Sequence, residues 1–286
     1  MTRPFLRPSR RVLRAFVRLR RATEGVAAVE FALILPLMLL LYLGSAETTQ
    51  AVIAGRKAAV AARTVADLVA QTAASTSMTD AQMGSIFNGA LVMMQPFPTA
   101  STTSTTPLLI DVSAVSFTQY TAAVSAALQP YVWVPTQSKL ASAFTPTTTD
   151  PGYAAKVRWS VNPGTSGVSS NTSMTGVAAA ATRTCGTGVN PLTPNTGAVA
   201  SLDTVNLSTG LYGPTSLIIA DIQYQYTPTF GATLVQIGKN ASWAGSVMTT
   251  HETMYMQPRN ATSVCSGSTD AYVCYTAQQT AACASY

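Results

Sequence analysis

The feature that most constrains this chain is an apolar run near its N-terminus. The run reads VAAVEFALILPLMLLLYLGSA from Val26 to Ala46 and contains one ionisable residue, Glu30. As a helix rising about 1.5 Å per residue it extends for roughly 30 Å, the thickness of the hydrocarbon core of a bilayer. Pro36 lies inside the run and is tolerated where neighbouring helices satisfy the freed carbonyl. The sequence has no second run of this kind, so we predict one transmembrane helix over residues 26–46.

The positive charge of the chain is concentrated before this run. Eight of the 17 basic residues precede Gly25, whereas the rest of the chain carries nine basic and ten acidic residues. A short basic arm beside an apolar run stays cytoplasmic under the positive-inside rule. A folded basic groove for DNA or RNA has little support, so we expect no nucleic-acid partner. With only 10% charged residues, the composition also disfavours an ordinary soluble enzyme. The basic residues of the arm are Arg3, Arg7, Arg10, Arg11, Arg14, Arg18, Arg20 and Arg21.

Three interpretations compete for the apolar run. A cleavable secretory signal would be cut before Glu47, after the small residues Gly44 and Ala46. A plain membrane anchor leaves Glu30 without a purpose, although a carboxylate in a membrane helix is costly and usually has a partner. A prepilin-type signal has a basic leader ending in Gly, a cut on the cytoplasmic side, and a Glu at the fifth position of the mature chain.

The third interpretation accounts for every element of this segment. Gly25 ends the basic leader, Val26 would become the new N-terminus, and Glu30 and Phe31 occupy the fifth and sixth positions. The stretch RRATEGVAAVEFALILPLMLLLYLGSAETTQ, residues 20–50, resembles the N-terminal domain of the TadE/TadG-like proteins of tight-adherence (Flp) pilus systems. The stretches ADIQYQYTPTFG, residues 220–231, and ETMYMQPRN, residues 252–260, are similar to the closing strands of the same family. Phe31 stands where the major Flp pilin has Tyr, which fits the pseudopilin branch.

The resemblance implies a function in assembly. It implies a minor pseudopilin that prepilin peptidase processes after Gly25 and that acts by subunit packing. The implied location is the bacterial inner membrane, with one span, a cytoplasmic N-terminus and a periplasmic C-terminal domain, in or at the base of the pilus. The implied partners are the prepilin peptidase, other pilin and pseudopilin subunits, inner-membrane pilus assembly proteins and the lipid bilayer. The alternative is a single-span anchored, or secreted, binding or adhesive domain.

This interpretation gives Glu30 a physical role. Cleavage after Gly25 creates a cationic α-amino group on Val26, which Glu30 of the same or a neighbouring subunit would neutralise. Single buried polar groups are known to fix the register of packed helices. We therefore expect Glu30 and Phe31 to belong to the assembly surface.

The remainder of the chain predicts an α+β, pilin-like fold in which a long N-terminal helix packs on an antiparallel sheet. Ala-rich sequence continues the first helix to about Ala74, and apolar residues at helical spacing indicate a second helix, capped from Ser77, Thr79 or Asp80 and ending at Met94. Alternating residues then predict strands over Leu108–Phe117, Ala155–Val161, Leu217–Thr227 and His251–Gln257.

These elements divide the chain into five regions. They are a basic cytoplasmic leader (1–25), the transmembrane helix (26–46), a periplasmic helical region (47–98), a sheet domain (99–260) with loop-rich inserts at 118–150 and 162–216, and a cysteine-containing tail (261–286). The second insert is rich in Gly, Ser, Thr, Asn and Pro, which predicts loops with room for short strands.

The four cysteines predict disulfides rather than a metal site. Cys185, Cys265, Cys274 and Cys283 all follow the membrane segment, and an even number in an exported domain favours two bridges of unknown connectivity. Zinc is disfavoured because the chain has no C-x-x-C pair and only one histidine, His251. We expect no cofactor and no catalytic residues. The weakest alternative is a hydrolase built from the scattered acids Asp111, Asp150, Asp203 and Asp221.

Overall fold

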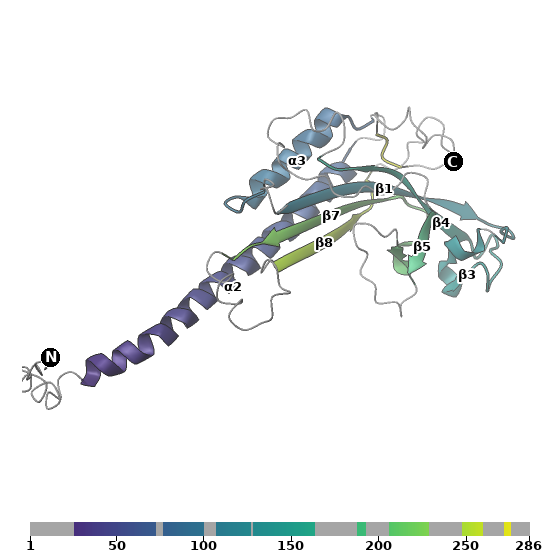
Figure 1. Ribbon diagram of the computed structural model, residues 1–286. Helices are drawn as coiled ribbons and strands as arrows, with labels where there is room; N and C mark the ends of the chain where they lie inside the picture. The colour runs from purple at the N-terminus through teal and green to yellow at the C-terminus, as the bar shows by residue number, and fades with distance from the viewer. Residues whose placement is uncertain are drawn as a thin grey trace, which may run out of the picture. The chain divides into compact units, whose positions relative to one another are not determined.

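The computed structural model describes residues 26–72, 77–99, 107–126, 128–163, 188–192, 206–228, 248–259 and 272–275 (Figure 1). The chain forms two compact units. The smaller, N-terminal unit contains Met1–Gln50 and Pro228–Ser246, and the larger unit contains Ala51–Thr227 and Val247–Tyr286.

The longest element is α2 (Val26–Ala70), one helix of 45 residues with Pro36 inside it. The helix ends at Ala70, slightly before the predicted end. At that point a residue from far along the chain caps it: the Arg259 backbone N–H donates to the carbonyl oxygen of Ala70 at 3.0 Å. The Arg259 guanidinium also lies 2.8 Å from the Asp67 carboxylate. Carbonyls in the last turn of a helix lack partners within the helix, so this contact defines the end of α2.

The second helix, α3 (Asp80–Met94), begins as the sequence predicts. Thr79 is its N-cap, and a capping box joins it to Gln82: the Gln82 backbone N–H donates to Thr79 Oγ1, and the Thr79 N–H donates to Gln82 Oε1. This satisfies two amides that the first helical turn leaves open. The apolar side chains of α3 at spacings of three and four are buried, namely Met83, Phe87, Ala90 and Met94.

The larger unit contains a mostly antiparallel sheet. Its path of neighbouring strands runs β3-β2-β4-β1-β7-β8, with β5 paired to β4 and β6 paired in parallel to β5. The strands are β1 (Leu108–Tyr120), β2 (Val132–Val134), β3 (Lys139–Leu140), β4 (Gly152–Val161), β5 (Gly188–Leu192), β6 (Asn206–Ser208), β7 (Leu217–Tyr226) and β8 (Met248–Met256).

The α+β prediction is confirmed, and the four strands expected from alternation are neighbours in the order β4-β1-β7-β8. Three of them extend beyond a predicted bound: β1 continues to Tyr120, β4 begins at Gly152 and β8 begins at Met248. The fourth, β7, ends at Tyr226, one residue before its predicted end. Cross-strand hydrogen bonding carries the strands past the point where their hydrophobic alternation ends. Each predicted insert contains short strands, β2 and β3 in the first and β5 and β6 in the second.

One face of the sheet packs against helices within the larger unit. The part of α2 after Gln50 contributes a stripe of small buried residues, which lets its backbone approach the strands closely. Figure 1 shows α2 and α3 along β1 and β7 in this unit. The buried stripe consists of Ala51, Ala54, Ala58, Ala61, Ala62, Val65, Ala66, Val69 and Ala70.

A β-bulge in β4 moves its apolar side chains from one face of the sheet to the other. The pairing of β1 with β4 shifts between Ala114, opposite Trp159, and Val115, opposite Val157, so Arg158 is the extra residue. An extra residue reverses the alternation beyond it. Trp159 therefore faces the helix-side core, whereas Val157 packs in a second core on the opposite face.

Candidate functional site

The first half of α2 displays apolar side chains all around the helix. Phe31, Leu33 and Tyr42 are 66%, 75% and 71% exposed, and the residues between them are similarly uncovered. Exposed apolar area of this extent requires another covering, a bilayer or other helices. Within the described chain, α2 is the one helix long and apolar enough to cross a membrane.

The residues predicted for processing and assembly lie at the start of this helix. Val26 is the first residue of α2, while Gly25 lies outside the described residues. Glu30 follows Val26 by about one helical turn, so the two positions are on the same side of the helix. The Glu30 side chain is exposed among apolar neighbours, and Phe31 beside it is also exposed.

Where the apolar run ends, hydroxyl side chains bond back to the helix. Thr48 Oγ1 donates to the Gly44 carbonyl at 2.7 Å, and Thr49 Oγ1 donates to the Ser45 carbonyl at 2.8 Å. Ser45 Oγ in turn donates to the Tyr42 carbonyl at 2.8 Å. Such back-bonding satisfies polar groups internally, as an apolar environment requires.

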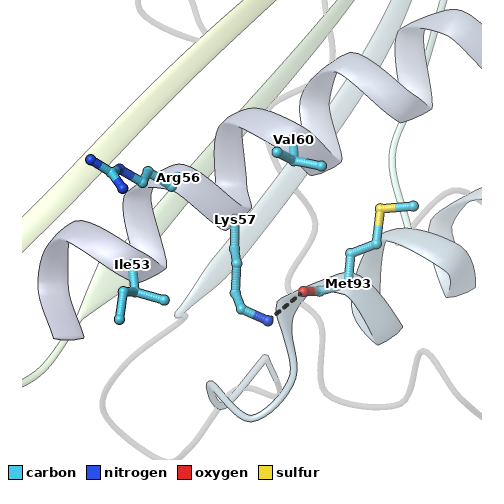
Figure 2. Close-up of a pocket in the computed structure, with 5 residues that line it drawn as sticks. All are labelled: Ile53, Arg56, Lys57, Val60 and Met93. Atoms are coloured by element: carbon cyan, nitrogen blue, oxygen red, sulfur yellow. Dashed lines mark hydrogen bonds between the residues drawn. The ribbon is translucent and has the colours of Figure 1, made fainter.

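The larger unit has a shallow groove between α2 and α3. It encloses about 320 Å³ and is lined by Ile53, Arg56, Lys57, Val60 and Met93 (Figure 2). Val60 at the rim is 58% exposed. The Arg56 guanidinium makes no hydrogen bond or ion pair with the residues that the structure describes. The outer side of α2 thus combines exposed apolar side chains with an available cation.

Lys57 has a structural partner within this groove. Its ammonium group donates to the carbonyl oxygen of Met93 at 3.2 Å (Figure 2). It also donates to the carbonyl oxygen of Gln95. These carbonyls end α3, where the helix dipole favours a positive charge. Lys57 therefore fixes the C-terminal end of α3 to α2.

The sheet buries a polar cluster that sequence reasoning did not assemble. Asp111 on β1 lies directly opposite Asp221 on β7, and these two residues are 0% and 1% exposed. The hydroxyls of Ser113 and Ser160 donate to the two oxygens of the Asp111 carboxylate at 2.8 and 2.7 Å. The Nε2 atom of His251 lies 3.7 Å from Asp221 Oδ1. The sequence indicated the cluster only through the alternation of β1 and β7, which places both acids on the face of the sheet away from the helices.

This cluster does not have the form of an active site. Both carboxylates are closed to solvent, so a substrate in solution has no access to them. No group of three or more His, Cys, Asp or Glu among the described residues is arranged to hold a metal ion. Asp150 lies in a bend two residues before β4 begins, and Asp203 falls outside the described residues. Of the three described acids among these four, Asp111 and Asp221 lie opposite each other and are buried.

One of the four predicted disulfide cysteines can be described. Cys274 is buried and disulfide-bonded. Cys185, Cys265 and Cys283 lie outside the described residues, so the connectivity of the bridges stays a prediction.

Comparison with known families gives a match in the N-terminal segment. A family model described as TadE-like protein matches residues 25–67. This segment is therefore similar to TadE-like proteins. Comparison with curated proteins and with solved structures gives no match.

The TadE-like segment begins at the predicted processing position and ends at Asp67, in the last turn of α2. It therefore contains the exposed apolar half of the helix, Glu30, and the α2 side of the groove. TadE-like proteins are structural components associated with tight-adherence pili rather than enzymes. The match does not include the strands or the inserts.

Proposed function

We propose that this protein is a minor pseudopilin of a tight-adherence pilus, processed by prepilin peptidase after Gly25 and acting through subunit packing. The observation that carries the proposal is the TadE-like helix itself. It starts at Val26, bears Glu30 one turn later, and leaves its first apolar half uncovered. The basic arm stays in the cytoplasm and the larger unit lies in the periplasm.

The mechanism that we propose is packing of the apolar half of α2 among helices of other pilus subunits. In that environment the α-amino group of Val26, created by cleavage, pairs with the carboxylate of Glu30 from the same or an adjacent subunit. An unpaired carboxylate among apolar helices is costly, so the pair favours one axial register over others. The outer side of α2 near Ile53, Arg56 and Val60 extends the packing surface beyond the membrane.

Cleavage is tested by the N-terminal mass of the full-length protein extracted from membranes, with and without the cognate prepilin peptidase. We expect a chain that starts at Val26 only when the peptidase is active. An intact leader in both strains would indicate a plain anchor, and a peptidase-independent start near Glu47 would indicate a secreted domain. Either result would remove the pseudopilin mechanism.

The register mechanism is tested separately with Glu30→Ala. We expect the variant to be cleaved and inserted normally, but to lose most of its co-purification with pilus components, because the α-amino group of Val26 loses its counter-charge. Glu47→Ala is the matched control, since it removes a carboxylate from the same helix beyond the apolar run. Unchanged recovery of Glu30→Ala would show that the pair does not set the register.

A further inference from the structure

Within the larger unit, α2 has an open side that faces away from the sheet. Ile53, Arg56, Val60 and Arg63 follow one another at spacings of three and four, so they lie on one side of the helix, and we call them the outer stripe. Ile53 and Val60 are 42% and 58% exposed, and both arginines are exposed. The buried alanines of α2 lie on the opposite side of the helix. The outer stripe is therefore an apolar and cationic surface on a helix whose other side is already packed.

The polar groups beside the outer stripe already have partners. Lys57 donates to the carbonyl oxygens of Met93 and Gln95 at the end of α3. Asp67, one turn beyond the stripe, lies 2.8 Å from the guanidinium of Arg259. The two arginines of the stripe make no hydrogen bond or ion pair with any residue that the structure describes. These two cations are available to a group outside the described chain.

The shape of the stripe suits a packed helix. Arg63 follows Arg56 by about two helical turns, roughly 10 Å along the axis. Between them, Val60 borders the groove of about 320 Å³ that Met93 closes from the side of α3. Figure 2 shows the Arg56 guanidinium pointing away from Met93, so the cation does not fill the groove. Side chains of one helix pack into grooves on another, and acidic residues two turns apart on a second helix have the same spacing as the two arginines.

Lipid headgroups are a second source of anions, but they lie too far away. Arg63 is about 25 Å along the continuous helix from Ala46, where the apolar run ends. The headgroup layer extends only about 6 Å beyond the hydrocarbon core of a bilayer. A helix tilted by about 40° still keeps Arg63 outside this layer. The position of the stripe therefore favours a protein partner.

We propose that the outer stripe docks one α-helix of another pilus subunit, which carries two carboxylates on either side of an apolar side chain. The apolar side chain enters the groove beside Val60, and the carboxylates pair with Arg56 and Arg63. Guanidinium and carboxylate groups form paired hydrogen bonds that fix the orientation of the two helices. The inference rests on the proposed function for its choice of a pilus subunit, and it specifies the chemistry of that partner.

The test measures binding of three stapled helical peptides to the purified full-length protein in mild detergent by fluorescence anisotropy. The first peptide has Glu at two positions seven apart on either side of a Leu. The second has Gln at both positions, and the third has one Glu moved to the opposite side of the helix. We expect the first peptide to bind at least five-fold more tightly than the other two, with an affinity that falls as salt is added.

Variants of the stripe make the result specific. Arg56→Gln and Arg63→Gln should each weaken binding of the Glu peptide by about two- to five-fold, because each removes one exposed ion pair. The double variant with Glu at both positions should prefer a peptide with Lys in place of Glu. Lys139→Gln is the control, since Lys139 is an exposed cation on β3, and it should leave the affinity unchanged. Urea unfolding midpoints equal to that of the wild-type protein establish that the variants fold.

Three results would overturn the inference. They are equal affinities for the Glu and Gln peptides, an affinity that is the same in both arginine variants as in the wild-type protein, and an unchanged peptide preference after charge reversal. Competition between the Glu peptide and phosphatidylglycerol added to the micelles would assign the arginines to lipid headgroups instead. Because binding is measured on the purified chain, an uncut leader would not affect it, and failed binding would leave cleavage after Gly25 untouched.

Discussion

At the scale of single residues, the buried carboxylate of Asp111 is accompanied by polar partners. Asp111 is fully buried, and both of its carboxylate oxygens accept a serine hydroxyl. The hydroxyl oxygens of Ser113 and Ser160 also lie 3.1 Å apart across β1 and β4, so the three side chains form one cluster. Asp221 lies directly opposite Asp111 on β7, and the Nε2 atom of His251 lies 3.7 Å from Asp221 Oδ1.

Asp111→Ala tests this cluster. The variant leaves the hydroxyls of Ser113 and Ser160 without their buried acceptor, which we expect to lower the free energy of unfolding by about 2–3 kcal/mol. Urea unfolding of the full-length protein in mild detergent measures the change. Asp150→Ala is the control, because Asp150 lies in a partly exposed turn and a surface substitution changes stability by about 0.5 kcal/mol or less. Equal effects of the two substitutions would contradict a stabilising role of the cluster.

At the scale of elements, the C-terminal ends of α2 and α3 are each capped by a residue from another element. Arg259, after β8, caps α2 at Ala70, and Lys57 on α2 caps the end of α3. The start of α3 is local, since the capping box lies within its first turn. Long-range caps join elements that would otherwise meet only through apolar packing.

Lys57→Met tests the cap at the end of α3. Methionine keeps most of the length of the side chain in the groove but provides no donor, so the carbonyls of Met93 and Gln95 lose a charged partner. We expect a loss of about 1 kcal/mol in the free energy of unfolding. Arg56→Met is the matched control on the same wall of the groove and should change stability by no more than about 0.5 kcal/mol. A loss as large in the control would mean that charge in the groove, rather than the cap, matters.

At the scale of the whole molecule, the chain has one segment with exposed apolar side chains and one unit with buried apolar cores. The first half of α2 leaves its apolar side chains exposed, whereas the larger unit buries its apolar side chains in cores on both faces of the sheet. The first arrangement fits a bilayer or a bundle of helices, and the second fits a domain that folds in water. The free energy of unfolding of the larger unit can therefore be measured while detergent covers the apolar first half of α2.

Buried tyrosines make this stability dependent on alkaline pH. Burial raises the pKa of Tyr224 to about 12 from the ordinary value of 10, and it also raises the pKa values of Tyr212 and Tyr275. A pKa that is higher in the folded state than in the unfolded state contributes stability below pH 10 that is lost as pH rises toward 12.

We therefore expect the unfolding midpoint in urea to be steady from about pH 8 to 9 and to fall above about pH 10. Tyr224→Phe removes a titrating hydroxyl, which donates to the Pro98 carbonyl at 3.2 Å, so its midpoint should fall less steeply although it starts lower. Parallel curves for the variant and the wild-type protein would show that Tyr224 does not contribute to the alkaline loss.

The sequence by itself determined the elements whose signals are local. The apolar run and Ala-rich continuation predict α2, the Thr79–Gln82 pair predicts the start of α3, and alternation predicts β1, β4, β7 and β8. The similarity to TadE-like proteins was also visible in the sequence, because Gly25, Glu30 and the apolar run lie within one short segment. These features depend on neighbours within a few turns or strand positions, which is where periodicity and capping act.

Only the tertiary structure decided which distant residues meet. Alternation does not reveal that Asp111 opposes Asp221, because strand register depends on pairing across more than a hundred residues. The bulge at Arg158 reverses the alternation of β4 and turns Trp159 toward the helix-side core. Residues 272–275 also meet distant partners: the Val273 carbonyl accepts from Trp159 on β4, and the Cys274 carbonyl accepts from Met78 just before α3.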